Sequence, residues 1–432
     1  MRNFTLLCAV LLSGSIAAQT YYPPLAGNTW ETVDPAALGW CTDEIPALID
    51  FLEQSNTKAF IVLKDGRIAI EHYFGTFTQD SLWYWASAGK SLTALLVGKA
   101  QEEGFLDIDE TSDTYLGAGW TNCAPLQEGQ ITIRHQLTMT TGFDDGVPDS
   151  DCTDPACLEC LAEPGTRWAY HNAPYTLLDG VITGATGQTL NGYVFNKLTL
   201  TTGLQGAFAQ LGSNNVFFSK ARAMARFGLL CMGQGAWNGN AVMNDQAYFS
   251  DMVSPSQSLN PSYGYLWWLN GQSSFMLPGL QQSFGGMLCP AMPADAYCAM
   301  GKNGQLCNVS PSTGLVVVRM GDLPGGIFVP NFYNNDIWVR LNDVMCTSTA
   351  TSDGTSSGIV RLWPNPASDL VRLTVDGSPV KQVEVLAADG RLLLSASNVA
   401  QFDASVLPVG HYLMTLRDGS DRLHCTPLVI VR

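Results

Sequence analysis

Runs rich in β-forming residues stand at both ends of the first 346 residues, with a long helical stretch between them. The early runs, 59–64 and 67–74, flank Asp65-Gly66, a dipeptide that favours a two-residue hairpin. Four more runs return late in the chain, at residues 262–269, 296–300, 306–309 and 315–320. This distribution predicts an α+β fold, in which distant segments form one antiparallel sheet that is flanked by helices and carries a helical subdomain.

Helix and linker patterns divide the rest of the chain. Apolar residues recur at helical spacing over residues 42–54, and a last helix of this part is expected at 335–344. Residues 347–358 (TSTATSDGTSSG) are small and polar, which is typical of a linker. Beyond it, residues 359–432 show short alternating strands between turn dipeptides, and these predict a small C-terminal β-sandwich. We therefore expect folded domains at 19–346 and 359–432.

The first 18 residues have the pattern of a secretory signal peptide rather than a membrane anchor. A basic Arg2 precedes an apolar run and then small residues, and the run is shorter than the about 20 residues that span a bilayer. We therefore expect an exported protein without a transmembrane segment. The chain carries 38 acidic and 22 basic residues, a formal net charge of −16, so a nucleic acid partner is not expected.

The chain has 12 cysteines, of which Cys8 falls in the predicted signal peptide and ten others precede the linker. An even number in an oxidising compartment favours disulfides, although the sequence does not define their pairing. A metal site on Cys152, Cys157 and Cys160 is the alternative. No histidine follows these cysteines at ligand spacing, so we expect neither a metal nor another cofactor. Cys425, beyond the linker, is expected to be a buried free thiol.

A serine and a lysine on one predicted helix are the first candidates for catalysis. Ser87 follows the aromatic residues 83–85 and opens an apolar helical run that ends near Gly104. A serine in the first turn lies at the positive end of the helix dipole. Lys90, one turn further on, shares its face and can take the proton from the serine hydroxyl.

Other serine motifs in the chain lack this setting. The spacing of Ser87 and Lys90 recurs at residues 55–58 and 378–381, but the first straddles a helix end and the second falls in the terminal domain. A GxSxG match at 354–358 lies in the linker, without the strand and the helix that a nucleophile elbow needs.

Two later motifs strengthen the assignment because of their order. Tyr170-His171-Asn172 precedes an apolar helical run, so Tyr170 can relay a proton and Asn172 can donate a hydrogen bond to a substrate. Lys302-Asn303-Gly304 lies between the last β-rich runs. Similar triplets at 333–335 and 64–66 have no comparable setting, and the second is better explained as a hairpin turn.

The chain from about residue 39 to residue 346 resembles the serine β-lactamase and penicillin-binding-protein superfamily, and looks closest to its class C-like esterases and aminohexanoate-oligomer hydrolases. The resemblance rests on six stretches: 85–90 (WASAGK), 131–142 (ITIRHQLTMTTG), 164–172 (PGTRWAYHN), 224–230 (MARFGLL), 263–268 (YGYLWW) and 301–305 (GKNGQ). It implies that Ser87 is the acylated nucleophile, that Lys90 is its proton acceptor or the partner that lowers its pKa, and that Tyr170 is a shared general base and acid. It also implies an oxyanion hole formed by the backbone N–H groups of Ser87 and Gln305, with Gln305 on the edge strand.

Further expectations concern the surroundings of these residues. Lys90 and Lys302 near Tyr170 are expected to lower the pKa of the tyrosine. Since Asn303 stands where relatives carry other residues, we hypothesise that Lys302 recognises a substrate carboxylate, with Asn172, Gly304 and Gln305 as further substrate-binding residues. Four tryptophans either line an apolar pocket or pack in the core, namely Trp85, Trp168, Trp267 and Trp268.

The terminal domain resembles the C-terminal sorting module of the type IX secretion system, on residues 364–367 (PNPA) and 407–412 (LPVGHY). This resemblance implies that the secretion machinery is a partner and that the protein is secreted or held at the cell surface. The predicted function is therefore that of a secreted serine hydrolase acting on a small-molecule ester or amide. The alternatives are a catalytically silent binding protein with the same fold, or a D-amino peptidase or β-lactamase of the same superfamily.

Overall fold

The computed structural model describes residues 19–324, 329–347, 360–365, 367–375, 380–387, 391–419 and 423–430. The predicted signal peptide, residues 348–358 of the predicted linker and the GxSxG match within it lie outside these residues. Within them, no helix combines the length and the apolar character needed to cross a bilayer.

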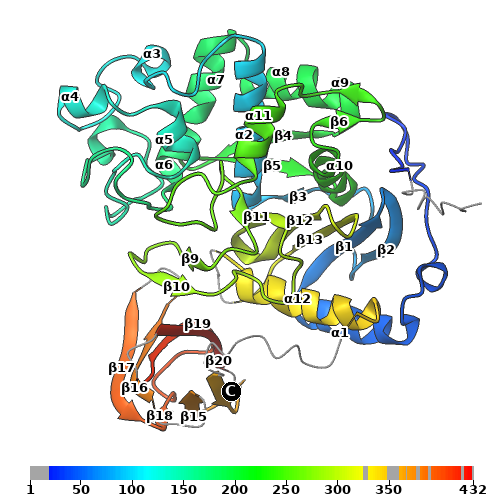
Figure 1. The fold of residues 1–432 in the computed structure, drawn as a ribbon, viewed down its shortest axis with the longest axis vertical. Helices are drawn as coiled ribbons and strands as arrows, with labels where there is room; N and C mark the ends of the chain where they lie inside the picture. Colours follow the sequence, from blue (N-terminus) through cyan, green and yellow to red (C-terminus); the bar gives the residue numbers. More distant parts are fainter. Residues whose placement is uncertain are drawn as a thin grey trace, which may run out of the picture.

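A six-stranded antiparallel sheet forms the centre of the larger domain (Figure 1), in the strand order β2-β1-β13-β12-β11-β8. Its strands are β1 (Thr57–Lys64), β2 (Arg67–Tyr73), β8 (Trp268–Leu269), β11 (Tyr297–Gly301), β12 (Gln305–Ser310) and β13 (Leu315–Gly321). The predicted hairpin is confirmed, since β1 and β2 pair across Asp65-Gly66, where both residues have positive φ. Segments more than 250 residues apart thus lie side by side, as β1 pairs with β13 from Thr57↔Gly321 to Lys64↔Leu315.

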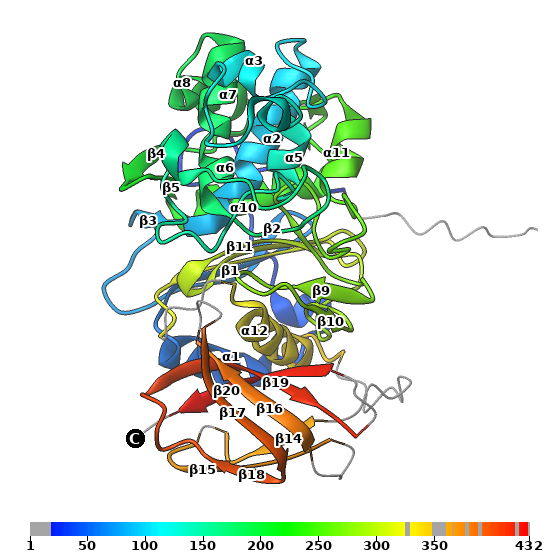
Figure 2. The ribbon, with the colours of Figure 1, turned by 90° about the vertical axis from the view of Figure 1, so that its left-hand side faces the viewer.

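Helices cover both faces of this sheet, which confirms the predicted α+β fold. Helices α1 (Ile45–Gln54) and α12 (Asn331–Val344) lie on one face, and α10 (Ala221–Met232) packs on the other, against β1, β12 and β13 (Figures 1 and 2). Every residue of β11, β12 and β13 is buried as a result. Burial on both faces agrees with the largely apolar sequences of β11 and β13, whereas half of the buried residues of β12 are polar.

The helical subdomain stands above the sheet in Figure 1. Its helices are α2 (Gly89–Glu102), α3 (Asp113–Leu116), α4 (Pro125–Glu128), α5 (Ile133–Leu137), α6 (Asn172–Thr176), α7 (Leu178–Thr186), α8 (Leu190–Val194), α9 (Leu200–Thr202) and α11 (Gln246–Met252). The region also holds a small sheet that the sequence did not predict, in the order β3-β5-β4. Its strands are β3 (Trp83–Tyr84), β4 (Gly206–Leu211) and β5 (Asn214–Ser219).

The prediction of a strand over 262–269 is wrong for most of its length. Only Trp268–Leu269 form a strand, because the chain doubles back and Tyr263 bridges to Trp268. Leu266, between them, has a φ of 57°. The aromatic residues that resemble a strand in composition therefore make a tight turn in the core.

The C-terminal domain is the predicted small β-sandwich. One sheet has the order β14-β15-β18 and the other β17-β16-β19-β20. Their strands are β14 (Val360–Trp363), β15 (Leu370–Val375), β16 (Val380–Leu386), β17 (Leu392–Val399), β18 (Gln401–Asp403), β19 (Gly410–Arg417) and β20 (Leu423–Ile430). The sandwich has its own apolar core, and β20 also touches β10 (Ser283–Gly285) of the larger domain, which pairs with β9 (Ser274–Met276).

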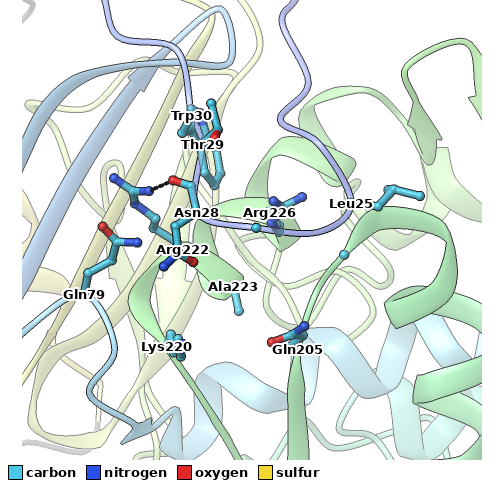
Figure 3. A pocket seen from close by; sticks show the side chains of 12 residues that line it. Leu25, Asn28, Thr29, Trp30, Gln79, Gln205, Lys220, Arg222, Ala223 and Arg226 are labelled. Atoms are coloured by element: carbon cyan, nitrogen blue, oxygen red, sulfur yellow. Dashed lines mark hydrogen bonds between the residues drawn. The ribbon is translucent and has the colours of Figure 1, made fainter.

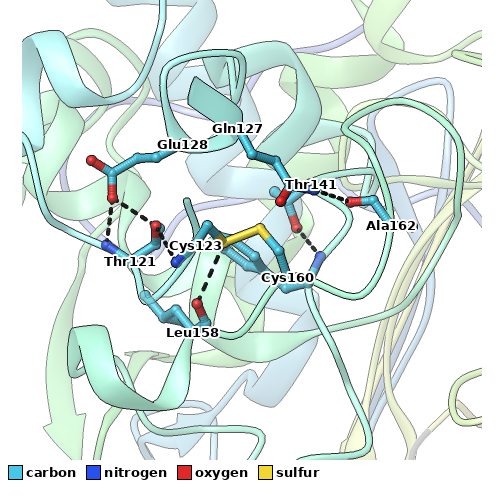
Figure 4. The surroundings of a disulfide bond; sticks show 9 residues. Thr121, Cys123, Gln127, Glu128, Thr141, Leu158, Cys160 and Ala162 are labelled. Atoms are coloured by element: carbon cyan, nitrogen blue, oxygen red, sulfur yellow. Dashed lines mark hydrogen bonds between the residues drawn. A yellow bond between two sulfur atoms is a disulfide. The ribbon is translucent and has the colours of Figure 1, made fainter. Parts of the chain in front are cut away.

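Within the part of the chain that the structure describes, three disulfides are formed, Cys41–Cys346, Cys123–Cys160 and Cys152–Cys157. All three cysteines of the alternative metal site are therefore paired. Figure 4 shows Cys123–Cys160 in a loop region that is also held by Gln127, whose Nε2 donates to the carbonyl of Ala162 at 2.9 Å.

The even count of cysteines before the linker favoured disulfides, and six of these ten cysteines form them while four do not. These four are free and buried: Cys231, Cys289, Cys298 and Cys307. They occupy core positions, where a thiol packs as a small apolar side chain. Cys425 is a free thiol, as predicted, and it is partly buried.

Candidate active site

Ser87 lies in a 3₁₀ turn, Ala86–Ala88, that leads directly into α2. The preceding Trp85 is fully buried and its indole nitrogen donates to the Ser219 hydroxyl at 2.7 Å, which anchors the turn to β5. Ala86 has a φ of 46°, a left-handed conformation that costs a residue with a Cβ about 1–2 kcal/mol. This sharp turn places a half-buried hydroxyl at the positive end of α2.

Lys90 contacts the Ser87 hydroxyl from the next turn of the same helix. Its Nζ is 2.8 Å from Ser87 Oγ and 2.7 Å from Oδ1 of Asn172. The faces of Tyr170 and Tyr175 also flank the amine, with ring centroids at 5.1 and 4.4 Å. Only 3% of Lys90 is exposed. This burial lowers the pKa of Lys90 to about 7, although the charge of Asp151 opposes the shift.

Tyr170 approaches Ser87 from the loop before α6, and the serine side chain is close enough to act on the pKa of the tyrosine hydroxyl, which it lowers. Its ring stacks on Trp268 at 5.7 Å and meets the edge of Tyr263 at 6.2 Å. The expectation that nearby lysines lower the pKa of this tyrosine is wrong, because burial raises the pKa of Tyr170 instead. Lys90 lies over the ring face, and the desolvation of the phenolate outweighs any stabilisation by cations.

Asn172 opens α6 and connects Lys90 to a carboxylate that the sequence did not point to. Its Nδ2 donates to Oδ1 of Asp151 at 2.7 Å, while its Oδ1 accepts from Lys90. Asp151 directly precedes Cys152, where the loop that the Cys152–Cys157 disulfide closes begins. A continuous path of hydrogen bonds thus runs from Asp151 through Asn172 and Lys90 to Ser87.

The end of β11 approaches the serine closely, and β12 also contacts the turn that holds Ser87. A Cβ on Gly301 would lie 3.0 Å from the Ser87 backbone nitrogen and 2.8 Å from that of Ala88, so this position requires glycine. Gln305 instead begins β12, which lies between β11 and β13, and the expectation that it lies on the edge strand is wrong. The Gln305 side chain is buried, and its amide exchanges two hydrogen bonds with the Gly321 backbone at 2.6 and 3.1 Å.

The Lys302-Asn303-Gly304 triplet forms the turn between β11 and β12. Lys302 is exposed. Asn303 donates to the Tyr84 hydroxyl at 3.0 Å, which fixes the turn against β3. Gly304 is buried, and its carbonyl accepts from Arg319 at 3.1 Å.

The four tryptophans singled out from the sequence are at most 2% exposed, so they pack in the core and do not line an open pocket. Trp168 and Trp268 still bear on the site, because Trp268 stacks on Tyr170 and Trp168 lies across Trp268 at 6.1 Å. They hold the tyrosine in place by packing.

The alternative serine at position 55 belongs to a structural network. Its hydroxyl lies 2.6 Å from the Tyr333 hydroxyl, and its carbonyl accepts from Arg319 at 2.7 Å. Both hydroxyl-bearing residues are at most 9% exposed. A substrate cannot reach Ser55 without opening the core.

A cavity of about 100 Å³ lies at the start of α10, and none of the residues assigned to the site lines it (Figure 3). Its basic residues already have partners. Arg222 pairs with Glu71 at 2.6 Å, Lys220 pairs with Asp80 at 2.6 Å, and Arg226 donates to two backbone carbonyls. The cavity therefore offers little unpaired charge to a ligand.

The fold and this arrangement define a member of the serine β-lactamase and penicillin-binding-protein superfamily. The chain belongs to the Beta-lactamase family, whose model matches residues 51–327, and residues 361–430 match the secretion system C-terminal sorting domain. Penicillin-binding protein 4* of Bacillus subtilis is 27% identical over 168 residues, which are 33% of this chain and 36% of that protein. The match therefore spans about a third of the relative's length.

Solved structures share the fold at low identity. A Bacillus anthracis protein assigned as a 6-aminohexanoate-dimer hydrolase has a TM-score of 0.53 and 19% identity, covering 68% of this chain and 81% of its own. A penicillin-binding protein homologue from Caulobacter crescentus has a TM-score of 0.53 and 15% identity, covering 72% and 99%. A β-lactamase/D-alanine carboxypeptidase from Pseudomonas syringae has the same score and identity, covering 73% and 100%.

Proposed function

We propose that this protein is a serine hydrolase that cleaves an ester or amide bond through an acyl-enzyme on Ser87. The observation that carries the proposal is the contact of the Lys90 amine with the Ser87 hydroxyl at 2.8 Å, with Tyr170 approaching the same serine from a distant loop. Ser87, Tyr170 and Asn172 are each partly exposed, so a substrate can reach the hydroxyl, whereas Lys90 is shielded from water.

Lys90 acts as the base in the first step. With its pKa near 7, a large fraction of the amine is neutral at physiological pH and has a lone pair for the serine proton. Ser87 Oγ bonds to the substrate carbonyl carbon as its proton passes to Lys90. Tyr170, with its pKa raised, stays protonated and relays a proton to the leaving group. Water then attacks the acyl-enzyme, and the same groups return the proton to Ser87 Oγ.

Backbone donors stabilise the charge that develops on the carbonyl oxygen. The Ser87 N–H is one donor, and we place the second at the end of β11, beside Gly301, because the backbone there lies directly against the Ser87 nitrogen. Each such donor contributes about 2.7–4 kcal/mol in other hydrolases.

Lys302 is proposed to select substrates that carry a carboxylate, since it is an exposed cation one residue beyond Gly301. Asn172 shares its amide between Lys90 and Asp151, and in the proposal it also borders the substrate. Short esters, linear amides, D-amino peptides and β-lactams all fit this chemistry.

The terminal domain supports export by a type IX secretion system, with residues 1–18 proposed as a signal peptide and the secretion machinery as a partner. We infer that the protein is secreted or held at the cell surface.

A substrate panel tests the proposal. Wild-type protein, Ser87→Ala and the matched control Ser55→Ala are assayed on the four substrate classes, with one ester offered both with a free carboxylate and as its methyl ester. We expect Ser87→Ala to lose all activity and Ser55→Ala to keep it. Activity that survives in Ser87→Ala contradicts the mechanism, and no turnover by wild-type protein favours a silent binding protein. Equal kcat/KM for the free and methylated substrates overturns the role of Lys302.

A further inference from the structure

Asp151 is connected to the proposed base, Lys90, by two successive hydrogen bonds through Asn172. The mechanism proposed above assigns no role to Asp151. Its Oδ1 accepts from Asn172 Nδ2 at 2.7 Å, and Asn172 Oδ1 accepts from Lys90 at 2.7 Å. We propose that Asp151 is a positioning residue, which fixes the orientation of the Asn172 amide and thereby directs the lone pair of Lys90 toward Ser87. This inference rests on the proposed function.

The argument begins with the donors and acceptors of each group. An ionised carboxylate only accepts hydrogen bonds, so the side of the Asn172 amide that faces Asp151 must be its NH₂ group. The amide oxygen then necessarily faces Lys90. A neutral amine that contacts a carbonyl oxygen can only donate to it, and its lone pair stays available for the hydroxyl on its other side, at 2.8 Å.

A rotated amide would reverse this arrangement. Its NH₂ group would donate to the lone pair of Lys90, and the amine would then have no acceptor site for the proton of Ser87. An asparagine without a charged neighbour has little preference between these two orientations, because its two ends are nearly equal in size. The carboxylate of Asp151 supplies that preference.

The loop around Asp151 is built to hold it in place. Its backbone N–H donates to Oδ1 of Asp149 at 3.1 Å, and the N–H of Cys152 donates to the Asp149 carbonyl at 3.2 Å. The Cys152–Cys157 disulfide closes the loop directly after Asp151. The carboxylate therefore has a fixed position from which to orient the amide.

Several titratable groups surround Lys90, and the test must separate them. Tyr170 and Tyr175 flank the amine, and both have pKa values raised by burial. Tyr175 is in turn influenced by the charge of Asp179, a carboxyl group whose pKa burial raises to about 7. Asp151 also acts on His171, whose pKa is lowered by burial. The ion pair of Asp145 and Arg167 acts on the same histidine. All these groups are present in both the wild-type protein and the Asp151 variants. A difference between their labelling profiles therefore reports the effect of Asp151.

The test measures the rate at which a fluorophosphonate labels Ser87, as a function of pH. In this reaction Ser87 Oγ bonds to phosphorus, fluoride leaves and the serine proton passes to Lys90. The variants are Asp151→Asn, which is isosteric but uncharged, and Asp151→Glu, which keeps the charge. Asp154→Asn is the matched control, because Asp154 is an exposed aspartate inside the same disulfide loop.

We expect two changes in Asp151→Asn. The labelling rate on the high-pH plateau falls by about 10- to 100-fold, since a general base contributes roughly 10²–10⁴-fold and part of this depends on its orientation. The midpoint of the profile also moves to lower pH, by about 0.5–1 unit, because the negative charge that favours the Lys90 ammonium is gone. Asp151→Glu keeps the wild-type midpoint, and Asp154→Asn matches wild type in both respects.

Other outcomes overturn the inference. A plateau and a midpoint equal to those of wild type show that Asp151 does not position the amide. A lower plateau with a midpoint moved to higher pH shows that the loop has opened and hydrated Lys90, which is a structural effect only. If wild-type protein is not labelled at Ser87 at all, it is the proposed function that fails, and this result is distinct from the other two.

Discussion

Lys90 is the residue whose surroundings most affect how the site works. It sits between two tyrosine rings and an amide, with no carboxylate in direct contact among its described hydrogen bonds. Burial therefore brings its pKa to about 7, far below the usual range of a lysine. A lysine in this state can serve as a base where a solvated one cannot.

The pH dependence of the reaction follows from this state. Below pH 7 the amine is protonated and cannot accept the serine proton, so we predict that Ser87 phosphonylation by a fluorophosphonate slows about tenfold per pH unit on the acid side. Above about pH 8 the rate should be constant. The measurement is the labelling rate between pH 5 and 10, and a midpoint above pH 9 would show that Lys90 retains an ordinary pKa.

Tyr170 and Tyr175 offer a matched pair for testing the role of a hydroxyl. Both rings flank Lys90, but of the two tyrosines only Tyr170 has its pKa affected by Ser87, whereas the Tyr175 hydroxyl donates to the Asn215 carbonyl at 3.4 Å. We predict that Tyr170→Phe lowers kcat by about 10²–10⁴-fold and that Tyr175→Phe lowers it less than tenfold. Thermal unfolding should be similar in both variants, since the rings remain. Equal kinetic losses would argue against a proton relay at Tyr170.

Among the elements, β11 and the turn before α2 must approach one another closely, and Gly301 makes this possible. A methyl group there would lie 2.4 Å from the Trp85 carbonyl oxygen and 3.0 Å from the Ser87 nitrogen, and backbone atoms cannot move aside cheaply. We predict that Gly301→Ala lowers kcat/KM by about 100-fold, the usual consequence of a shift of about 1 Å between reacting groups.

Gly285→Ala is the control for this substitution, since a Cβ on Gly285 of β10 meets no atom within 4 Å. Steady-state kinetics on the best substrate of the panel provide the measurement. If Gly301→Ala retains full activity, β11 does not form the wall of the site that we describe.

The sequence predicted those elements whose pattern is local, and it failed where distant contacts decide the structure. The hairpin at Asp65-Gly66 is recognisable because its turn residues and its apolar runs agree. Strand β4 was missed because only Phe208 along it is buried, so it has no apolar alternation to detect. Residues 262–267 were misread as a strand because aromatic residues favour strands, whereas packing in the core decided here in favour of a turn.

The same distinction applies to the site. Ser87 and Lys90 are one helical turn apart, and their contact follows from the spacing alone. Asp151 reaches the site through a loop, and its described side-chain hydrogen bond is with Asn172, 21 residues away. No sequence motif around Asp151 therefore indicated its place in the site. The burial that raises the pKa of Tyr170 is likewise a property of the assembled core.

At the scale of the whole molecule, two disulfides are expected to have different consequences. Cys41–Cys346 joins the two ends of the larger domain across 305 residues, whereas Cys152–Cys157 spans five residues beside Asp151. We predict that replacing Cys41 and Cys346 with serine lowers the free energy of unfolding by about 2–5 kcal/mol and leaves the labelling rate of Ser87 at 25 °C unchanged.

Replacing Cys152 and Cys157 with serine should affect labelling more than stability. The free energy of unfolding should fall by less than about 2 kcal/mol, because closing a short loop removes little entropy from the unfolded chain. The labelling of Ser87 should become slower, because the loop adjoins Asp151. Denaturant unfolding and labelling kinetics on both pairs provide the measurement. A labelling rate that falls equally in the two pairs would mean that the small loop has no special link to the site.

The central claim is that one hydroxyl in this chain becomes a nucleophile because a buried neutral amine adjoins it. Mass spectrometry of the full-length protein after treatment with a fluorophosphonate at pH 8 tests this most directly, with Lys90→Met as the comparison. We predict a single adduct, on Ser87 in wild-type protein, and a loss of that adduct in Lys90→Met. An adduct on another residue, or equal labelling of Ser87 in the two proteins, would contradict the claim.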